Sequence, residues 1–292
     1  MCQKKFKHHK VFTLKEKFDY DQIHYAIIWN LPNKVLKKLI NLKVIFSLGA
    51  GVDHIINLSS YKDIPILRIK DPNMASRMSY HVHSQILNFQ LKLNLFQKAQ
   101  IKRVWLGEME TLLNKNITIG ILGAGFLGTS VGKYLKKLEY KVIGFKKSHP
   151  QVKTPFPIYS KGKLEKFIKS SDIIVSILPS TKDTTNFIDQ NFLKKMKKNS
   201  LLINIGRGAS LNEDHLLKQL NQNKNFFASL DVFKTEPLPK NHKFWNHPNI
   251  TITPHAAALT DIASSIDLMH SRYLLSKKNG KFISDVNLKK GY

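Results

Sequence analysis

A glycine-rich turn between a predicted strand and a predicted helix constrains the fold of this chain more than any other feature. The turn is Gly123-Ala-Gly-Phe-Leu-Gly128; residues 116–122 before it form an apolar run, and residues 126–138 after it have helical periodicity. In this context the first glycine permits a tight turn, the second lets pyrophosphate approach the backbone, and the third lets helix and strand pack closely. The helix N-terminus then faces the anion. The pattern predicts a dinucleotide site formed by Gly123, Gly125, Phe126, Leu127 and Gly128.

Short apolar runs follow this turn and alternate with polar, helix-like stretches. We expect strands at 141–145, 172–178, 200–205, 226–230 and 250–253, and a loop at 150–157. Strands that alternate with helices indicate βαβ units, which build a parallel sheet. This half of the chain is therefore predicted to be a doubly wound α/β domain.

The N-terminal part repeats the alternation on a smaller scale. We expect a strand, a turn and a second strand (25–29) within 11–29, strands at 43–48 and 64–69, and a helix at 31–41. A long helix over 79–102 leads from one domain to the next, and a last helix begins near Thr260 or Asp261 and ends at Gly280. We predict a substrate domain over 1–84, a dinucleotide-binding domain over 85–257, and a C-terminal helix over 258–292 that returns to the substrate domain.

The net charge of +27 raises the possibility of nucleic-acid binding. However, 42 of the 47 basic residues are lysines scattered along the chain, a pattern more typical of codon bias in an AT-rich genome. We see no signal peptide and no apolar stretch long enough to span a bilayer. The single cysteine, Cys2, excludes an intrachain disulfide, and no His/Cys spacing indicates a metal. We expect a cytoplasmic protein without nucleic-acid or membrane partners.

The strand at 141–145 ends in two lysines where dinucleotide-binding domains commonly place an acidic residue. That acid binds the ribose 2′-hydroxyl of NADH, whereas a basic side chain accommodates the 2′-phosphate of NADPH. Lys146 and Lys147 therefore favour NADPH over NADH. The alternative is that they are two of many surface lysines.

Three separated residues supply the groups that carbonyl reduction needs: Arg207, Glu236 and His255. The planar guanidinium of Arg207, just past a predicted strand end, can bind a carboxylate or a keto oxygen at two points. His255, after Pro254, can give a proton, and a carboxylate such as Glu236 fixes the tautomer of an imidazole and favours its protonated form. Asp231, at the end of its strand, is a candidate acceptor for the nicotinamide carboxamide.

The chain resembles the D-isomer-specific 2-hydroxyacid dehydrogenases, and within that family the bacterial NADPH-dependent glyoxylate/hydroxypyruvate reductases of the A type. The resemblance covers nearly the whole chain. Besides the glycine turn, it rests on Gly49-Ala-Gly-Val-Asp53, Leu178-Pro-Ser-Thr181, Asn204-Ile-Gly-Arg-Gly208, Leu230-Asp-Val-Phe233, Glu236-Pro-Leu-Pro239, Ile252-Thr-Pro-His-Ala-Ala257 and the final Lys-Gly-Tyr292.

The resemblance implies two similar α/β domains, a flavodoxin-like substrate domain and a Rossmann cofactor domain, with a cleft between them. It assigns substrate binding to Arg207, orientation of the histidine to Glu236, and acid/base chemistry to His255. It further implies that backbone amides around Ala50 and Gly51 hold the substrate carboxylate. The implied assembly is a homodimer, in which Trp105 lies in an arm that reaches the partner's active site. Pro179 and Thr184 are further candidates for cofactor binding.

Two departures from the family pattern concern the substrate domain and the interdomain helix. Relatives usually begin with an additional strand and helix before the segment that matches Val11–Leu14, so the first domain is expected to lack a central strand, unless the true start lies upstream. Tyr80 stands where relatives tend to have a glutamate.

The implied activity is NADPH-dependent reduction of glyoxylate to glycolate and of hydroxypyruvate to D-glycerate, with weaker use of NADH. Two alternatives stay open beside nucleic-acid binding: reduction of another small 2-keto acid, and a non-enzymatic protein that senses NAD(P).

Overall fold

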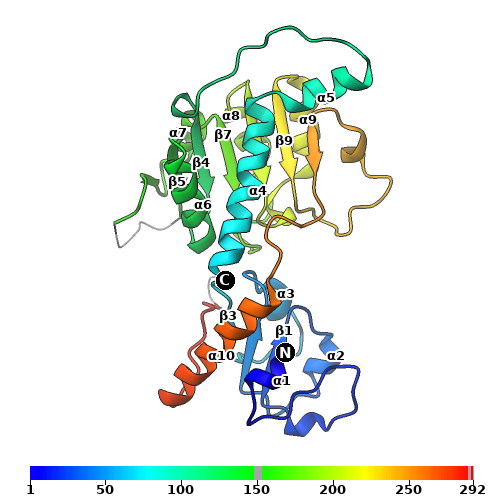
Figure 1. Cartoon of the computed structure of the whole chain (residues 1–292), viewed down its shortest axis with the longest axis vertical. Coiled ribbons are helices and arrows are strands. Elements are labelled where there is room, and N and C mark those ends of the chain that lie inside the picture. Colours follow the sequence, from blue (N-terminus) through cyan, green and yellow to red (C-terminus); the bar gives the residue numbers. More distant parts are fainter. Residues whose placement is uncertain (148–152, 289–290, 292) are drawn as a thin grey trace. The chain divides into compact units, whose positions relative to one another are not determined.

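The chain divides into two compact units, which are described here one at a time. The computed structural model describes residues 1–147, 153–288 and 291 (Figure 1). One unit comprises Met1–Met74 and Thr260–Tyr292, and the other Ala75–Leu259. The first division falls inside helix α4 (Pro72–Gln90), earlier than the predicted 84/85, and the second falls just after the predicted 257/258.

The larger unit is built on a seven-stranded parallel sheet with the strand order β10-β9-β8-β7-β4-β5-β6. Its strands are β4 (Thr118–Leu122), β5 (Lys141–Phe145), β6 (Ile158–Tyr159), β7 (Ile173–Ser176), β8 (Ser200–Asn204), β9 (Phe226–Leu230) and β10 (Ile250–Ile252). Every strand predicted for this half is present. After β4 the chain adds β5 and β6 on one side of it. The chain then returns to the other side of β4, where it adds β7, β8, β9 and β10, so the sheet has a topological switch point between β4 and β7. Open α/β sheets bind ligands at such a point, outside the carboxyl ends of the strands.

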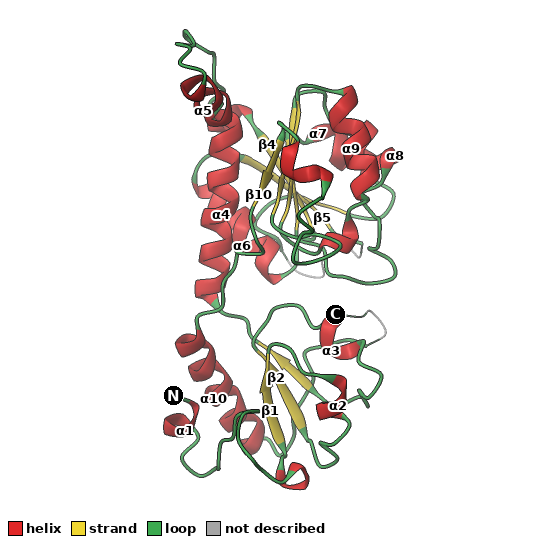
Figure 2. Cartoon of the chain, turned by 90° about the vertical axis from the view of Figure 1, so that its right-hand side faces the viewer, coloured by secondary structure: helices red, strands yellow, loops and turns green. Residues whose placement is uncertain are grey.

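Helices cover both faces of this sheet (Figure 2). Helices α4 and α6 (Phe126–Lys137) pack on one face, where Val82, Val131 and Leu135 are buried against Ile119 and Val175. The other face carries α7 (Leu164–Ser170), α8 (Gln190–Lys195) and α9 (Glu213–Gln222). Burial on both faces explains why the strands are continuous apolar runs. Full burial of each large apolar side chain contributes about 1.5–3 kcal/mol.

The smaller unit has a three-stranded parallel sheet in the order β1-β2-β3. The strands are β1 (Tyr25–Ile28), β2 (Val44–Ser47) and β3 (Ile66–Arg68). Helices α2 (Asn33–Leu36) and α3 (Asp53–Ile56) pack on one face, and α1 (Cys2–Lys5) and α10 (Ile262–Lys278) contribute to the apolar cluster on the other. The Asp261 carboxylate caps α10 by accepting the N–H groups of Ala263 and Ser264, so this helix begins where the sequence predicts. The expected α/β class with parallel sheets is confirmed.

Three predictions of local structure were wrong. The first strand expected within 11–29 does not form, because the N–H groups of Val11 and Thr13 donate to the side chains of Gln3 and Glu16 rather than to another strand. The helix expected at 31–41 is limited to α2. The helix expected at 79–102 begins earlier and breaks into α4 and α5 (Leu93–Ile101) at Lys92, whose φ is 57°.

Short 3-10 turns complete the chain: η1 (Tyr20–Gln22), η2 (Asn114–Asn116), η3 (Gly208–Ser210) and η4 (Lys243–Asn246). The loop predicted at 150–157 lies partly outside the described residues. Among the helices that the structure describes, none has the length and apolar character needed to cross a membrane.

Candidate active site

The predicted chemical residues of the larger unit gather where its parallel strands end. The glycine turn follows β4, Pro179 and Thr184 follow β7, Arg207 follows β8, Asp231 and Glu236 follow β9, and His255 follows β10. Because the carboxyl ends of parallel strands lie at one edge of a sheet, the fold places these groups on the same side of the unit.

Glu236 and His255 form a hydrogen-bonded pair. Nδ1 of His255 lies 2.7 Å from Oε2 of Glu236, while Oε1 of the same carboxylate accepts the N–H of Phe233 at 2.9 Å. The two side chains are 38% and 35% exposed, so the pair remains accessible to a ligand. With Nδ1 donating to the carboxylate, Nε2 is the ring atom that can exchange a proton with a substrate.

Asp231 holds the turn that carries His255. Its carboxylate is buried and accepts hydrogen bonds from Thr253 Oγ1 (2.6 Å), Ala256 N (2.8 Å) and Ala257 N (3.0 Å). Its backbone carbonyl accepts the N–H of His255 at 2.8 Å. These bonds fix His255 in a left-handed conformation with φ of 53°. Asp231 is therefore a structural anchor of the turn, whatever else it binds.

The loops that carry Arg207 and Glu236 are in backbone contact. A Cβ atom added to Gly208 would lie 1.9 Å from the carbonyl carbon of Phe233, so only glycine allows this approach. Nη1 of Arg207 donates to the carbonyl of Gly206 at 2.9 Å, and the Arg207 carbonyl accepts from Ser210 Oγ at 2.7 Å. Arg207 thus follows β8 in a loop packed directly against the loop of Glu236.

The glycine turn has the geometry that a bound pyrophosphate needs. Gly123 has φ of 100°, and a Cβ on Gly128 would lie 2.3 Å from the Gly123 carbonyl, so turn and helix pack as the sequence predicts. At Gly125, the N-cap of α6, an added Cβ would meet no atom within 4 Å. The turn therefore leaves open space beside the N-terminal amides of α6, whose first residues are Phe126 and Leu127.

Three comparisons with known proteins place this arrangement in a family. Residues 83–257 match the family model described as "D-isomer specific 2-hydroxyacid dehydrogenase, NAD binding domain". Glyoxylate/hydroxypyruvate reductase A of Yersinia enterocolitica is 32% identical over 280 residues, which is 94% of this chain and 89% of that protein. The same-named protein of Serratia proteamaculans is 35% identical over 256 residues, 86% of this chain and 82% of its own length.

A solved structure agrees with the sequence matches. It is the NADPH-dependent glyoxylate/hydroxypyruvate reductase of Sinorhizobium meliloti in complex with NADP and sulfate, which is 31% identical. It superimposes with a TM-score of 0.88 over 94% of this chain and 88% of that one. The chain belongs to the D-isomer specific 2-hydroxyacid dehydrogenase family. The resemblance inferred from the sequence motifs, including the similarity to A-type reductases, is thereby confirmed.

The predicted cofactor residues after β5 and β7 lie in two loops of this dehydrogenase. Nζ of Lys147 pairs with Oδ2 of Asp183 at 2.8 Å, and both side chains are 72% exposed. Lys146 continues the backbone pairing at this end of β5, where its N–H donates to Tyr159 O at 3.0 Å. Thr184 Oγ1 donates to the carbonyl of Pro179 at 2.6 Å and so closes the loop after β7. Their contacts with a cofactor stay predictions.

The remaining predicted residues lie elsewhere. Ala50 and Gly51 follow β2 in the smaller unit, where the Ala50 carbonyl accepts from Nη1 of Arg68 at 3.5 Å. Trp105 follows α5 in the larger unit and is 95% exposed. Tyr80 is an exposed residue of α4 that stacks edge-on against Tyr134. The substrate-binding roles predicted for Ala50, Gly51 and Trp105 remain predictions.

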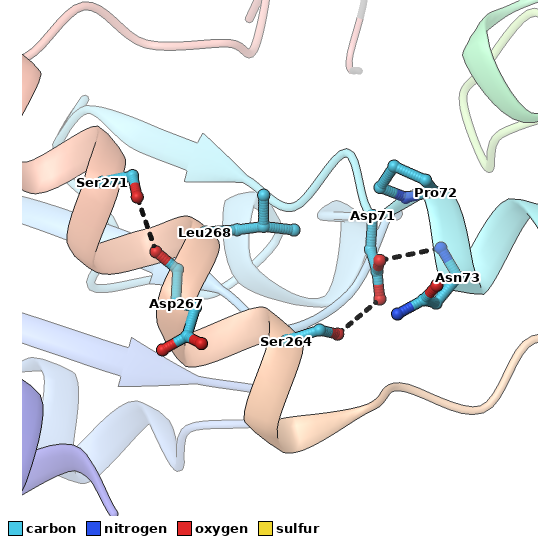
Figure 3. Close-up of a pocket in the computed structure, with 7 residues that line it drawn as sticks. All are labelled: Asp71, Pro72, Asn73, Ser264, Asp267, Leu268 and Ser271. Atoms are coloured by element: carbon cyan, nitrogen blue, oxygen red, sulfur yellow. Dashed lines mark hydrogen bonds between the residues drawn. The ribbon is translucent and has the colours of Figure 1, made fainter.

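A polar hollow in the smaller unit has a structural explanation (Figure 3). It encloses about 320 Å³ beside Asp71, which is 1% exposed. One carboxylate oxygen of Asp71 accepts the N–H of Asn73 at 2.9 Å, and the other accepts Ser264 Oγ at 3.1 Å. Asp71 thus joins the start of α4 to α10, with both oxygens satisfied.

Two groups of the larger unit were missed by the sequence analysis. Burial lowers the pKa of His81 on α4, although the nearby carboxylate of Asp231 opposes the shift. Its Nε2 atom is buried and has no hydrogen-bond partner among the described residues. Glu213 on α9 accepts the N–H of Lys234, two residues before Glu236. A histidine and a glutamate inside helical patterns carry no sequence signal for such contacts.

Proposed function

We propose that the protein reduces glyoxylate to glycolate and hydroxypyruvate to D-glycerate with NADPH. The single observation that carries the proposal is the Glu236–His255 pair at the carboxyl edge of a dinucleotide-binding sheet. Bound NADPH would supply the hydride. His255 would give the keto oxygen its proton through Nε2, and Glu236 would stabilise the imidazolium before transfer. Arg207 would hold the carboxylate and polarise the keto group.

Several features of this chain fit the cofactor. The open space at Gly125 can accept pyrophosphate at the N-terminus of α6. Asp231 already accepts three hydrogen bonds, and because a carboxylate offers about four acceptor positions, one remains for a carboxamide N–H. Lys146 and Lys147 supply positive charge for a 2′-phosphate.

The substrate assignment rests on the two-point contact that Arg207 offers and on the relatives' activities. A site built from a guanidinium and a general acid recognises the 2-keto acid unit and makes few specific contacts with the rest of the substrate. Glyoxylate and hydroxypyruvate meet that demand with small substituents. The predicted backbone amides around Ala50 and Gly51, in the smaller unit, would hold the substrate carboxylate.

The decisive experiment measures NADPH oxidation with the purified protein against a panel of 2-keto acids. We expect the highest kcat/KM with glyoxylate or hydroxypyruvate and a clear loss with phenylpyruvate. Preference for another small keto acid would replace the substrate assignment. Tight NADPH binding without turnover of any member would leave a cofactor-sensing protein, and the enzymatic proposal would be withdrawn.

We further propose that the protein is a homodimer in the cytoplasm. Exposed apolar side chains occur along α5 and the segment after it, which we call the arm: Leu93, Phe96, Ile101, Val104, Trp105, Leu106, Leu112 and Leu113. Many exposed large apolar side chains along one segment are typical of a segment that packs against another protein surface. The arm therefore supports a second copy of this chain as the partner.

A further inference from the structure

Glu213 joins the two ends of the loop that carries Glu236. Its Oε1 accepts the N–H of Lys234 at 3.0 Å, and its Oε2 lies 3.5 Å from Nε2 of His242. Nδ1 of His242 accepts the N–H of Phe244, so the ring proton sits on Nε2 and faces Glu213. Only 18% of the Glu213 side chain is exposed, so these contacts are better shielded from water than those of an ordinary surface pair.

The segment held by Glu213 is also the one that orients the catalytic carboxylate. Phe233, the residue before Lys234, donates its N–H to Oε1 of Glu236. Residues 234–237 of the loop are exposed, and a cavity of about 380 Å³ beside them is lined by Glu213, Lys234 and His242 among others, so few packed side chains hold this segment. Where packed side chains are few, the position of a loop depends on its hydrogen bonds.

We propose that Glu213 is a positioning residue for the Glu236–His255 pair, an inference that rests on the proposed function. Glu213 acts through the loop: it fixes Lys234 and His242, the loop keeps Glu236 in place, and Glu236 holds Nδ1 of His255 at 2.7 Å. Loss of the carboxylate frees the loop to move, and Glu236 then spends part of its time away from the imidazole.

The test compares Glu213→Gln with Asp214→Asn. Asp214 is the exposed neighbour in the same helical turn, so its substitution removes the same charge and serves as the matched control. For Glu213→Gln we expect kcat to fall about fivefold, the equivalent of one ordinary hydrogen bond, with KM changed less than about twofold. The alkaline limb of the pH profile of kcat should also move to lower pH. An imidazolium with a weaker carboxylate partner releases its proton more easily. Asp214→Asn should match the wild type in kcat, in KM and in the pH profile.

A double-mutant cycle distinguishes positioning from a general structural effect. In a Glu236→Gln background, adding Glu213→Gln should cost almost nothing further in kcat, since the carboxylate that Glu213 positions is gone. An equal loss in both backgrounds, an unmoved pH profile, or an equal effect of Asp214→Asn would overturn the proposal. Thermal unfolding of each variant checks that the fold is kept.

The positioning role has a readout that does not need turnover. The downfield proton NMR signal of Nδ1–H of His255, which is hydrogen-bonded to Glu236, should be weaker in Glu213→Gln than in the wild type, and identical signals would overturn the proposal. If the wild type reduces no keto acid but this signal still changes in the variant, the proposed function fails while the positioning role stands.

Discussion

At the scale of single residues, the site depends on a backbone conformation that few non-glycine residues adopt. His255 has φ of 53°; such conformations cost about 1–3 kcal/mol and persist only where surrounding interactions offset that cost. Here Asp231 fixes the turn by accepting the N–H groups of His255, Ala256 and Ala257. Glu236 therefore receives an imidazole whose position is already set.

His255→Gln should lower kcat by about 10²–10⁴-fold, the usual contribution of a positioned general acid. Glutamine occupies similar space but cannot deliver a proton as an imidazolium does. NADPH affinity, measured by fluorescence titration, should change little because the predicted contacts with the cofactor are made by the glycine turn and the lysines after β5, not by the His255 side chain. Near-normal turnover in this variant would show that another group gives the proton.

Replacing Lys146 and Lys147 with serine should weaken NADPH much more than NADH. A charged hydrogen bond contributes about 1.5–3 kcal/mol, which corresponds to roughly 10- to 150-fold in affinity. Lys147 already pairs with Asp183, so Asp183→Asn should strengthen NADPH slightly by removing a competitor for that ammonium. The matched control replaces Lys133 and Lys137, two exposed lysines of α6, and should affect both cofactors equally. Equal losses for NADPH and NADH in the first variant would exclude a role in reading the 2′-phosphate.

The sequence predicted the paired side chains of this site better than the hydrogen bonds that hold their loops in place. Glu236 and His255 stand in recognisable settings, and the structure brings them together. The anchoring bonds of Asp231 and the contact of Glu213 with Lys234 could not be predicted, because they depend on where loops from different strands meet in space.

At the scale of elements, prediction succeeded where burial dictates the sequence. The strands of the larger sheet are apolar on both faces, and their positions follow directly from that pattern. The long helix predicted at 79–102 breaks at Lys92, whose left-handed conformation has no local signal such as glycine. The strand expected before β1 fails because side chains, which pattern reasoning ignores, satisfy its N–H groups.

Gly208→Ala should separate the loop of Arg207 from the loop of Glu236. The new Cβ would lie 1.9 Å from the Phe233 carbonyl carbon, so the backbone has to shift, at a cost of about 1–3 kcal/mol for such overpacking. We expect kcat/KM to fall at least about tenfold and Tm to drop measurably. Unchanged kinetics in Gly208→Ala would show that the two loops need not touch for catalysis.

At the scale of the whole molecule, charge and exposed apolar surface point to different partners. The net charge of +27 favours the approach of anions in general, which include both the proposed cofactor and small keto acids. It does not by itself select a nucleic acid. The exposed side chains of the arm, among them Ile101 and Trp105 at 83% and 95% exposure, require a different explanation, and the proposed homodimer would supply one.

If the arm joins two copies, charged residues placed in it should separate them. In a symmetric dimer each substitution occurs twice, and each large apolar side chain that is buried contributes about 1.5–3 kcal/mol. Ile101→Glu combined with Leu113→Glu should therefore weaken dimerisation at least about a hundredfold, as measured by sedimentation equilibrium. The matched control is Ile40→Glu with Ile283→Glu, two comparably exposed apolar residues of the smaller unit, and it should remain dimeric. A monomeric wild type, or equal dissociation of the control, would exclude the arm as the dimer interface. If the arm variant is monomeric as expected, its activity tests the predicted contribution of Trp105 to the partner's site. A residue that acts across the interface no longer contributes once the two copies have separated.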